Sequence, residues 1–401
     1  MHADTGTRTR AIRRSVGRRD SSCLSLGLLL ATMVACGGSE GERACEVTPP
    51  AAWSAPEWDV NTKDAIALRD RLSALTGEAF MRGAETGAIS VSVADLTAAY
   101  EAGSPSLRSA TSSYFHGVLP DAFAEFVEAV GAGTQDLVDS GSSWTPGMEG
   151  GIWSANQRAF NESGLEVRQV VDKALSGGAT LYNYALGLTA SPISGATIEA
   201  MAAAFGANPA LNPGRSNDVV AENRNLFSAN YVYQMGLYAQ AKKALVDAKA
   251  YAGDEACTAE RDAAIQSFFR TWEQGLYARF TFYANKAANR MAAVTDDEAR
   301  ATALHDLAEG LGLALSFHGI TSPASGPMKS TTRLMTDAHI SAAVNALGVT
   351  VSGDLGDGFT GGFVSNTIGF FDAVRGAENV VVEAYGLNQD QLSSYWAPTD
   401  G

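Results

Sequence analysis

Two residues with metal-binding or acid–base chemistry, His305 and Glu309, lie four positions apart in a segment with helical periodicity. On a helix they lie on one face, and Gly312 and Ser316 continue the same stripe beside an apolar one. An imidazole and a carboxylate one turn apart can share one metal ion, and the small residues would let another helix come close. A hydrogen-bonded pair at a helix–helix boundary, or a solvated edge, explains the spacing equally well, because such polar pairs are common on helices.

A second polar stripe precedes this one by more than a hundred residues. Glu166, Gln169 and Lys173 share one side of a segment whose apolar stripe begins with Val167 and Val170. Read alone, this stripe predicts a face in contact with solvent. We expect the helices over 164–186 and 296–318 to face each other, which would place Glu166, Gln169, His305 and Glu309 around one buried polar site.

Common enzyme signatures are missing from the sequence. There is no H-E-x-x-H, no phosphate-binding G-x-x-x-x-G-K-[ST] and no strand-linked G-x-G-x-x-G. The G-x-S-x-G match over 37–41 lies in a polar segment without the strand and helix that a nucleophile elbow requires. The remaining histidines receive no functional assignment, and His318 at a helix end is explained by the helix dipole. The sequence alone therefore does not predict a catalytic residue.

The N-terminus has the pattern of an export signal. Six arginines lie within residues 8–19, and a short apolar run, Leu24 to Ala35, ends directly before Cys36. The run is too short to cross a bilayer of about 30 Å, and a basic region followed by such a run is typical of a signal peptide. Small residues before a cysteine resemble the bacterial lipobox, which predicts cleavage after residue 35 and lipidation of Cys36. The alternative is an ordinary signal peptide with an incidental cysteine.

This interpretation predicts a protein of the cell envelope that is anchored by lipid. Gly37 follows the lipidated position where a retention signal would have Asp, which favours the outer membrane, facing the periplasm. Of the other cysteines, Cys45 and Cys257 remain after cleavage, and in an oxidising compartment they are most simply a disulfide. The alternative is two unpaired thiols.

Composition and periodicity predict an all-α antiparallel helical bundle with long loops. Lys and Arg total 29 against 44 Asp and Glu, a net charge of −15, which excludes nucleic acid as a partner because phosphate binding needs a basic surface. Residues 1–35 are the predicted signal, 36–57 a flexible tether, and 58–401 an all-helical domain or two packed helical subdomains. Helices are expected over 62–76, 92–100, 120–130, 164–186, 197–205, 219–250, 258–291 and 296–318, and the single weak strand signal over 349–351.

Two blocks of residues resemble an uncharacterised family of bacterial lipoproteins, the domain-of-unknown-function 4856 family, which is related to the imelysins. The second block is His305 to Leu313, and the first consists of Pro146-Gly147, Arg158, Phe160-Asn161, Gly164-Leu165-Glu166, Gln169, Lys173, Leu175 and Gly178-Ala179. The resemblance would cover roughly residues 58–395 and implies an all-helical fold. Imelysins carry a helical Gly-x-His-x-x-Glu, where this chain has Gly164-x-Glu166-x-x-Gln169.

That departure replaces an imidazole and a carboxylate with a carboxylate and an amide, which are weaker ligands for a transition metal. The resemblance therefore implies a non-catalytic binding or accessory module in metal uptake, iron-related, with iron or zinc as the metal ion. A metal-dependent peptidase is the alternative, in which Glu309 or Glu166 would act as general base. The third interpretation is a structural lipoprotein that binds an envelope protein, its polar stripes serving only to hold helices together.

Overall fold

The computed structural model describes residues 43–135, 150–153, 156–161, 164–220, 223–329, 333–348 and 367–396. The chain divides into two compact units, Met1–Arg43 and Ala44–Gly401. All described residues except Arg43 belong to the second unit. The predicted signal peptide, Cys36, the Pro146-Gly147 pair and the weak strand signal over 349–351 lie outside the described residues.

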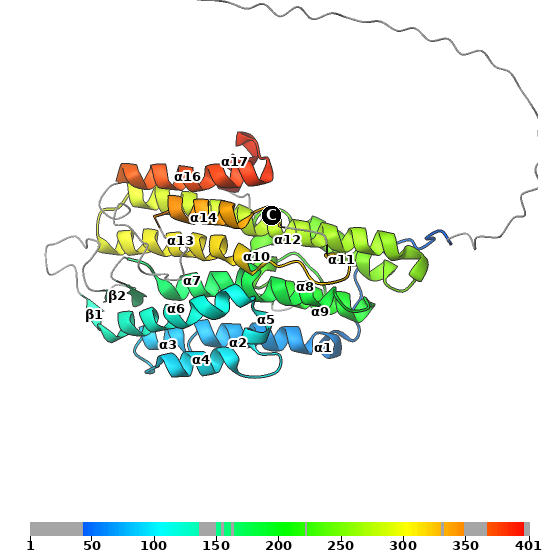
Figure 1. Cartoon of the computed structure of the whole chain (residues 1–401), viewed down its shortest axis with the longest axis horizontal. Coiled ribbons are helices and arrows are strands. Elements are labelled where there is room, and N and C mark those ends of the chain that lie inside the picture. Colours follow the sequence, from blue (N-terminus) through cyan, green and yellow to red (C-terminus); the bar gives the residue numbers. More distant parts are fainter. Residues whose placement is uncertain are drawn as a thin grey trace, which may run out of the picture. The chain divides into compact units, whose positions relative to one another are not determined.

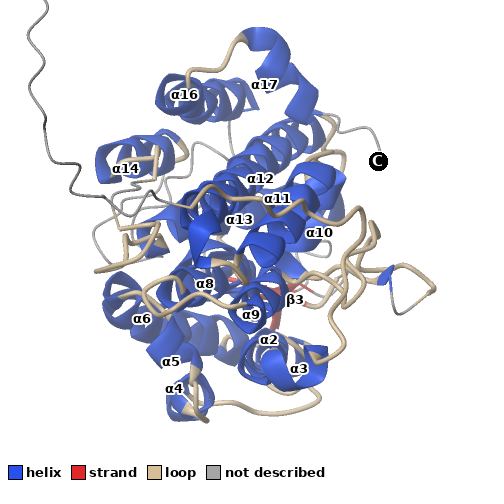
Figure 2. Ribbon diagram, turned by 90° about the vertical axis from the view of Figure 1, so that its right-hand side faces the viewer, coloured by secondary structure: helices blue, strands red, loops and turns tan. Residues whose placement is uncertain are grey.

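The unit is an all-α helical bundle, as predicted (Figures 1 and 2). Its helices are α1 Trp58–Asn61, α2 Lys63–Thr76, α3 Met81–Glu85, α4 Val93–Glu101, α5 Leu107–Ala110, α6 Ser113–Gly131, α7 Val167–Ala174, the π-helix η1 Leu175–Tyr182, α8 Asn183–Leu188, α9 Gly195–Phe205, α10 Phe227–Gln234, α11 Tyr238–Tyr251, the 3₁₀ helix η3 Glu255–Cys257, α12 Thr258–Ala292, α13 Asp297–Ser316, the 3₁₀ helix η4 Phe317–Gly319, α14 Asp337–Ala346, α16 Thr367–Tyr385 and α17 Gln389–Trp396.

The long helix α12 is the centre of the bundle, with α11 and α13 packed along it (Figure 1). Its predicted apolar stripe is buried from Ile265 to Met291. Trp272 of this stripe packs edge-on against Tyr182 of η1 and Phe205 of α9, at ring-centroid distances of 4.8 and 4.9 Å. Because aromatic rings bury large apolar areas, these contacts join three segments that are far apart in the sequence.

Local signals placed several helix ends correctly. Ser92 and Asp95 form a capping box at the start of α4, where a helix was expected over 92–100. Gly206 ends α9 with φ of +99°, where a Cβ would lie 2.0 Å from the Leu226 carbonyl oxygen, so only glycine fits.

Three predicted helices have different bounds in the structure. The helix expected from residue 120 begins at Ser113, and Pro120 lies inside it. The single helix expected over 219–250 is two helices, α10 and α11, interrupted at Gly236, which has φ of +72°. The helix expected over 164–186 begins at Val167 and widens into the π-helix η1, in which Gly177 has a non-helical conformation.

A small sheet was not predicted. It has three strands in the order β1 Thr134–Gln135, β2 Gly151–Trp153 and β3 Arg158–Phe160, with β1 parallel and β3 antiparallel to β2. Strands of two or three residues are too short to show an alternating pattern in sequence. β3 matters for the site, because it carries Arg158.

The predicted disulfide between Cys45 and Cys257 is present and closes a separation of 212 residues. The segment after Cys45 also contacts the bundle through Trp53, whose indole nitrogen donates to the Pro209 carbonyl oxygen at 3.1 Å. In the part of the chain that the structure describes, no helix has both the length and the apolar composition needed to span a bilayer.

Candidate functional site

Helices α7 and α13 lie against each other because glycines remove the side chains that would separate them. A Cβ on Gly312 would lie 2.6 Å from the Val170 carbonyl oxygen and 2.8 Å from the Lys173 Cβ. One turn later, a Cβ on Gly178 of η1 would lie 2.4 Å from the carbonyl oxygen of Ser316. The small residues predicted to admit a second helix do so, and the two polar stripes face each other.

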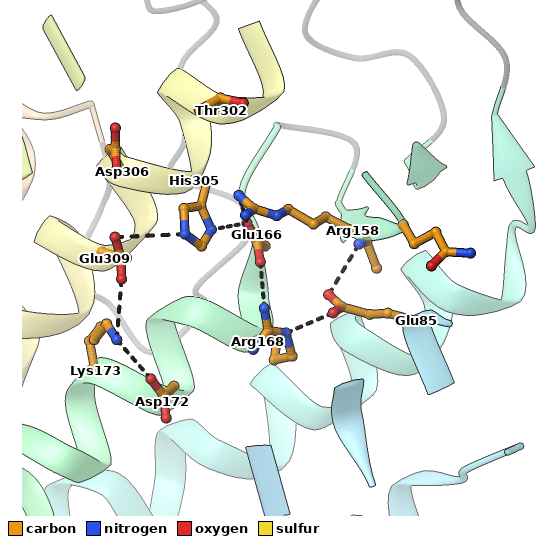
Figure 3. Close-up of polar contacts among 12 residues, drawn as sticks. Glu85, Arg158, Glu166, Arg168, Asp172, Lys173, Thr302, His305, Asp306 and Glu309 are labelled. Atoms are coloured by element: carbon orange, nitrogen blue, oxygen red, sulfur yellow. Dashed lines mark hydrogen bonds and ion pairs between the residues drawn. The ribbon is translucent and has the colours of Figure 1, made fainter. Parts of the chain in front are cut away.

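The structure brings Glu166, His305 and Glu309 together, with the imidazole between the two carboxylates (Figure 3). His305 Nδ1 is 2.7 Å from Glu166 Oε2, a hydrogen bond. Its Nε2 is 3.7 Å from Glu309 Oε2, which is an ion-pair distance but too long for a hydrogen bond. The imidazole is thus fixed on one side, and its second nitrogen faces a carboxylate across a gap.

Glu166 is completely buried, and its charge is offset by three basic groups. Its Oε1 accepts from Arg168 Nη2 at 3.0 Å, and Arg158 Nη1 from β3 lies 3.8 Å from Oε2. Burial by itself raises the pKa of Glu166, but the hydrogen bond and charge of His305, together with the two arginines, outweigh it and lower the pKa below its ordinary value. Glu166 is therefore ionised, and it fixes the orientation of the imidazole.

The polar cluster formed by Glu166, His305 and Glu309 continues through Arg168 to Glu85 of α3. Arg168 Nε donates to Glu85 Oε2 at 2.7 Å, and the Ala159 backbone N–H donates to Glu85 Oε1 at 3.2 Å. Burial, with the nearby charge of Glu166, raises the pKa of Glu85 despite these contacts. Glu85 was not among the predicted residues, because it lies in a five-residue helix whose sequence shows no polar stripe.

At the Glu309 end of the polar cluster, Lys173 pairs with two carboxylates. Its Nζ lies 3.2 Å from Glu309 Oε1 and 3.0 Å from Asp172 Oδ2, and the Thr76 hydroxyl donates to Asp172 Oδ1 at 3.0 Å. Burial lowers the pKa of Lys173, but Tyr231, Asp172 and Glu309 more than offset this and hold it well above its ordinary value. One oxygen of Glu309 is therefore committed to Lys173, while the other faces His305.

The predicted solvent face over 166–173 was wrong, because Glu166 and Gln169 are both buried. The charges opposite this face lie on α3 and α13, which are distant in sequence, and on the short strand β3, and the periodicity of one helix could not predict them. The Gln169 side chain does not join the three other predicted residues: among the described residues its Oε1 has no hydrogen-bond partner. His318 lies in η4, pairs with Asp337 at 3.0 Å and stacks on Tyr114.

The described residues contain no set of three His, Cys, Asp or Glu side chains arranged to hold a metal ion. The geometry offers two donors, His305 Nε2 and Glu309 Oε2. Tetrahedral ligands about 2.1 Å from a metal lie roughly 3.4 Å apart, close to the 3.7 Å separation seen here. A carboxylate on the other imidazole nitrogen, as Glu166 provides, is the usual support for a metal-binding histidine.

Comparisons of the chain with protein-family models, with curated proteins and with solved structures give no match. The resemblance to the lipoprotein family, and the function that it implies, stay predictions.

Proposed function

We propose that the chain is a lipid-anchored cell-envelope protein that binds a metal ion without catalysing a reaction, as a binding or accessory module. The observation that carries this is the position of His305. The Glu166 carboxylate accepts a hydrogen bond from Nδ1 at 2.7 Å, so Nε2, which lies 3.7 Å from Glu309 Oε2, is the imidazole nitrogen that could bind a metal ion. The side chain of His305 is 14% exposed, so the imidazole is partly open to solvent.

Two protein donors make a weak site, and other ligands must complete the coordination. Imidazole with one carboxylate suits zinc or ferrous iron better than calcium, which prefers oxygen ligands alone. A link to iron uptake rests on the family resemblance only. The absence of a catalytic role is supported by the pairing of Glu166 with Arg168 and of Glu309 with Lys173, since a general base must be available to take a proton.

Metal titration tests the proposal. The full chain, purified in detergent and treated with chelator, is titrated with zinc, and with ferrous iron under anaerobic conditions, in a calorimeter. We expect saturable binding with one metal per chain. His305→Ala and Glu309→Ala each remove one of two donors and should abolish saturation, whereas Glu166→Gln leaves both donors and should weaken affinity about 10–100-fold.

His116→Ala is the matched control, because the hydrogen bonds of the His116 imidazole within the described residues go to the backbone carbonyl oxygens of Arg108 and Thr111. The metal assignment fails if the wild type shows no saturable binding, or if His305→Ala binds as the wild type does. Chelator-sensitive cleavage of an unfolded substrate such as casein would instead support the peptidase alternative.

The anchor is tested separately. We expect labelled palmitate to be incorporated into the wild type and not into Cys36→Ser, which should leave the membrane fraction. Equal membrane association of both proteins would contradict lipid anchoring at Cys36.

A further inference from the structure

Arg279 of α12 is a buried cation without a carboxylate partner among the described residues. The residue is 8% exposed. Its Nη2 donates to the Tyr283 hydroxyl at 2.8 Å, and its guanidinium carbon lies 4.2 Å from the ring centroids of both Phe282 and Tyr283. Its buried Nε has no acceptor. The planar guanidinium group of Arg279, which has five N–H donors, thus makes one hydrogen bond in the described part of the chain.

This state is costly for a folded protein. Buried charges are normally paired, and buried donors are normally satisfied. Aromatic faces offset part of the cost through cation–π attraction, but a ring face does not satisfy the remaining N–H groups. Arg168, whose side chain is 12% exposed, shows the contrast, because it has two carboxylates, Glu85 and Glu166. The described contacts of Arg279 leave its charge without a carboxylate and its buried Nε without an acceptor.

A second cation lies near an aromatic ring that Arg279 also approaches. Lys173 Nζ is 5.6 Å from the centroid of the Tyr231 ring, and the Arg279 guanidinium carbon is 5.9 Å from the same centroid. Tyr231 belongs to α10, so helices α7, α10, α12 and α13 meet at this point. Lys173 already contacts Asp172 and Glu309, whereas the guanidinium fork is available.

We propose that this four-helix junction binds an oxyanion, which is a carboxylate or phosphate group of a small molecule. Arg279 would donate the hydrogen bonds, and the nearby positive charge of Lys173 would add electrostatic attraction. An arginine fork matches the two oxygens of such a group, and its hydrogen bonds to an anion are stronger than those to a neutral acceptor. The inference goes beyond the proposed function, because oxyanion binding at Arg279 needs no metal at His305.

The experiment titrates the chelator-treated full chain with citrate and with inorganic phosphate at constant ionic strength, and follows binding by calorimetry and by the melting temperature. We expect saturable binding and a rising melting temperature for at least one of the two anions. Arg279→Met should weaken binding by about tenfold or more, which is the loss of one charged hydrogen bond. Arg108→Met removes the same charge from an exposed ion pair with Glu101 and should bind as the wild type does.

The ligand-free melting temperature separates a binding role from a structural one. If Arg279 is held unpaired for a ligand, Arg279→Met should melt at a higher temperature than the wild type without anion. A lower value, with anion binding unchanged, would show that the guanidinium only packs against the aromatic rings. Arg279→Lys keeps the charge without the fork, and we expect it to fold and to bind about tenfold more weakly. Absence of saturable binding of both anions to the wild type overturns the proposal.

Discussion

The buried carboxylate of Glu166 contacts three basic side chains, those of His305, Arg168 and Arg158. A buried carboxylate of this kind is stable only while its partners remain. Breaking a buried ion pair by neutralising one partner leaves the other charge buried and only partly compensated. An exposed pair has no such cost, since water replaces the lost partner.

We expect Glu166→Gln to lower the free energy of unfolding at pH 7 by about 3 kcal/mol, measured by urea unfolding. Glu101→Gln is the control, because Glu101 and Arg108 are each almost half exposed, and we expect a loss below about 1 kcal/mol. The folded-state pKa of Glu166 is lowered, so its contribution is present above pH 4.5 and is lost as the pH falls through the folded-state pKa. A difference that grows on acidification would contradict the assigned pairing.

The four-residue spacing of His305 and Glu309 alone was enough to predict that they lie on one face of a helix, because spacing along a helix is a local property. The partner of His305, Glu166, was reached only by assuming that two distant helices meet. Arg279 and Glu85 could not be found from sequence, because an arginine among aromatic residues or a glutamate in a short helix has no local signature. What identifies them is burial, which depends on the whole fold.

Among the elements, the contact between α7 and α13 determines the site, and Gly312 determines that contact. We expect Gly312→Ala to lower the free energy of unfolding by about 2 kcal/mol, because its methyl group would meet backbone at Val170, which cannot rotate away. The same variant should weaken metal binding at His305, since α7 carries Glu166.

Gly117→Ala is the matched control for this substitution. Gly117 is exposed inside α6, and a Cβ there meets no atom within 4 Å. Replacing glycine by alanine in an open helical position reduces the entropy of the unfolded chain, so we expect a gain of about 0.5–1 kcal/mol. If both variants lost the same free energy of unfolding, the close packing at Gly312 would not be the cause of the destabilisation.

Helix existence was predictable and helix continuity was not. The apolar stripe of α12 runs from Ile265 to Met291 within a helix of 35 residues, so the helix was evident from periodicity. Pro120 predicted a helix start, yet α6 runs through it, with seven buried residues holding the helix together on both sides of the proline. The π-helix η1 arises where Gly177 and Gly178 pack against α13, which is a tertiary contact.

For the molecule as a whole, α12 also receives the C-terminal helices. Tyr385 of α16 donates to Glu273 of α12 at 2.9 Å, and Gln274 of α12 donates to Tyr395 of α17 at 3.0 Å. The disulfide joins Cys45 to Cys257, directly before the start of α12. One helix therefore contacts segments from both ends of the described chain.

Glu378 of α16 gives this arrangement a measurable pH dependence. Its carboxylate is buried and accepts from Arg375 at 2.6 Å and from the Trp396 indole at 2.9 Å. Burial raises the pKa of Glu378 from 4.5 to about 6, although both donors oppose the rise. The folded protein thus keeps a proton that the unfolded chain has already lost, and the contribution of Glu378 to stability should fall by about 2 kcal/mol between pH 4.5 and 6.

We expect Glu378→Gln to remove this dependence, because the amide does not titrate in this range. Relative to the wild type, the free energy of unfolding of the variant should therefore rise by about 2 kcal/mol as the pH increases from 4 to 7, measured by urea unfolding at four pH values. Glu383→Gln removes an exposed carboxylate from the same helix, and subtracting its effect isolates the buried group. A difference that stays constant with pH, or falls, would mean that α16 and α17 leave the carboxyl of Glu378 in contact with water.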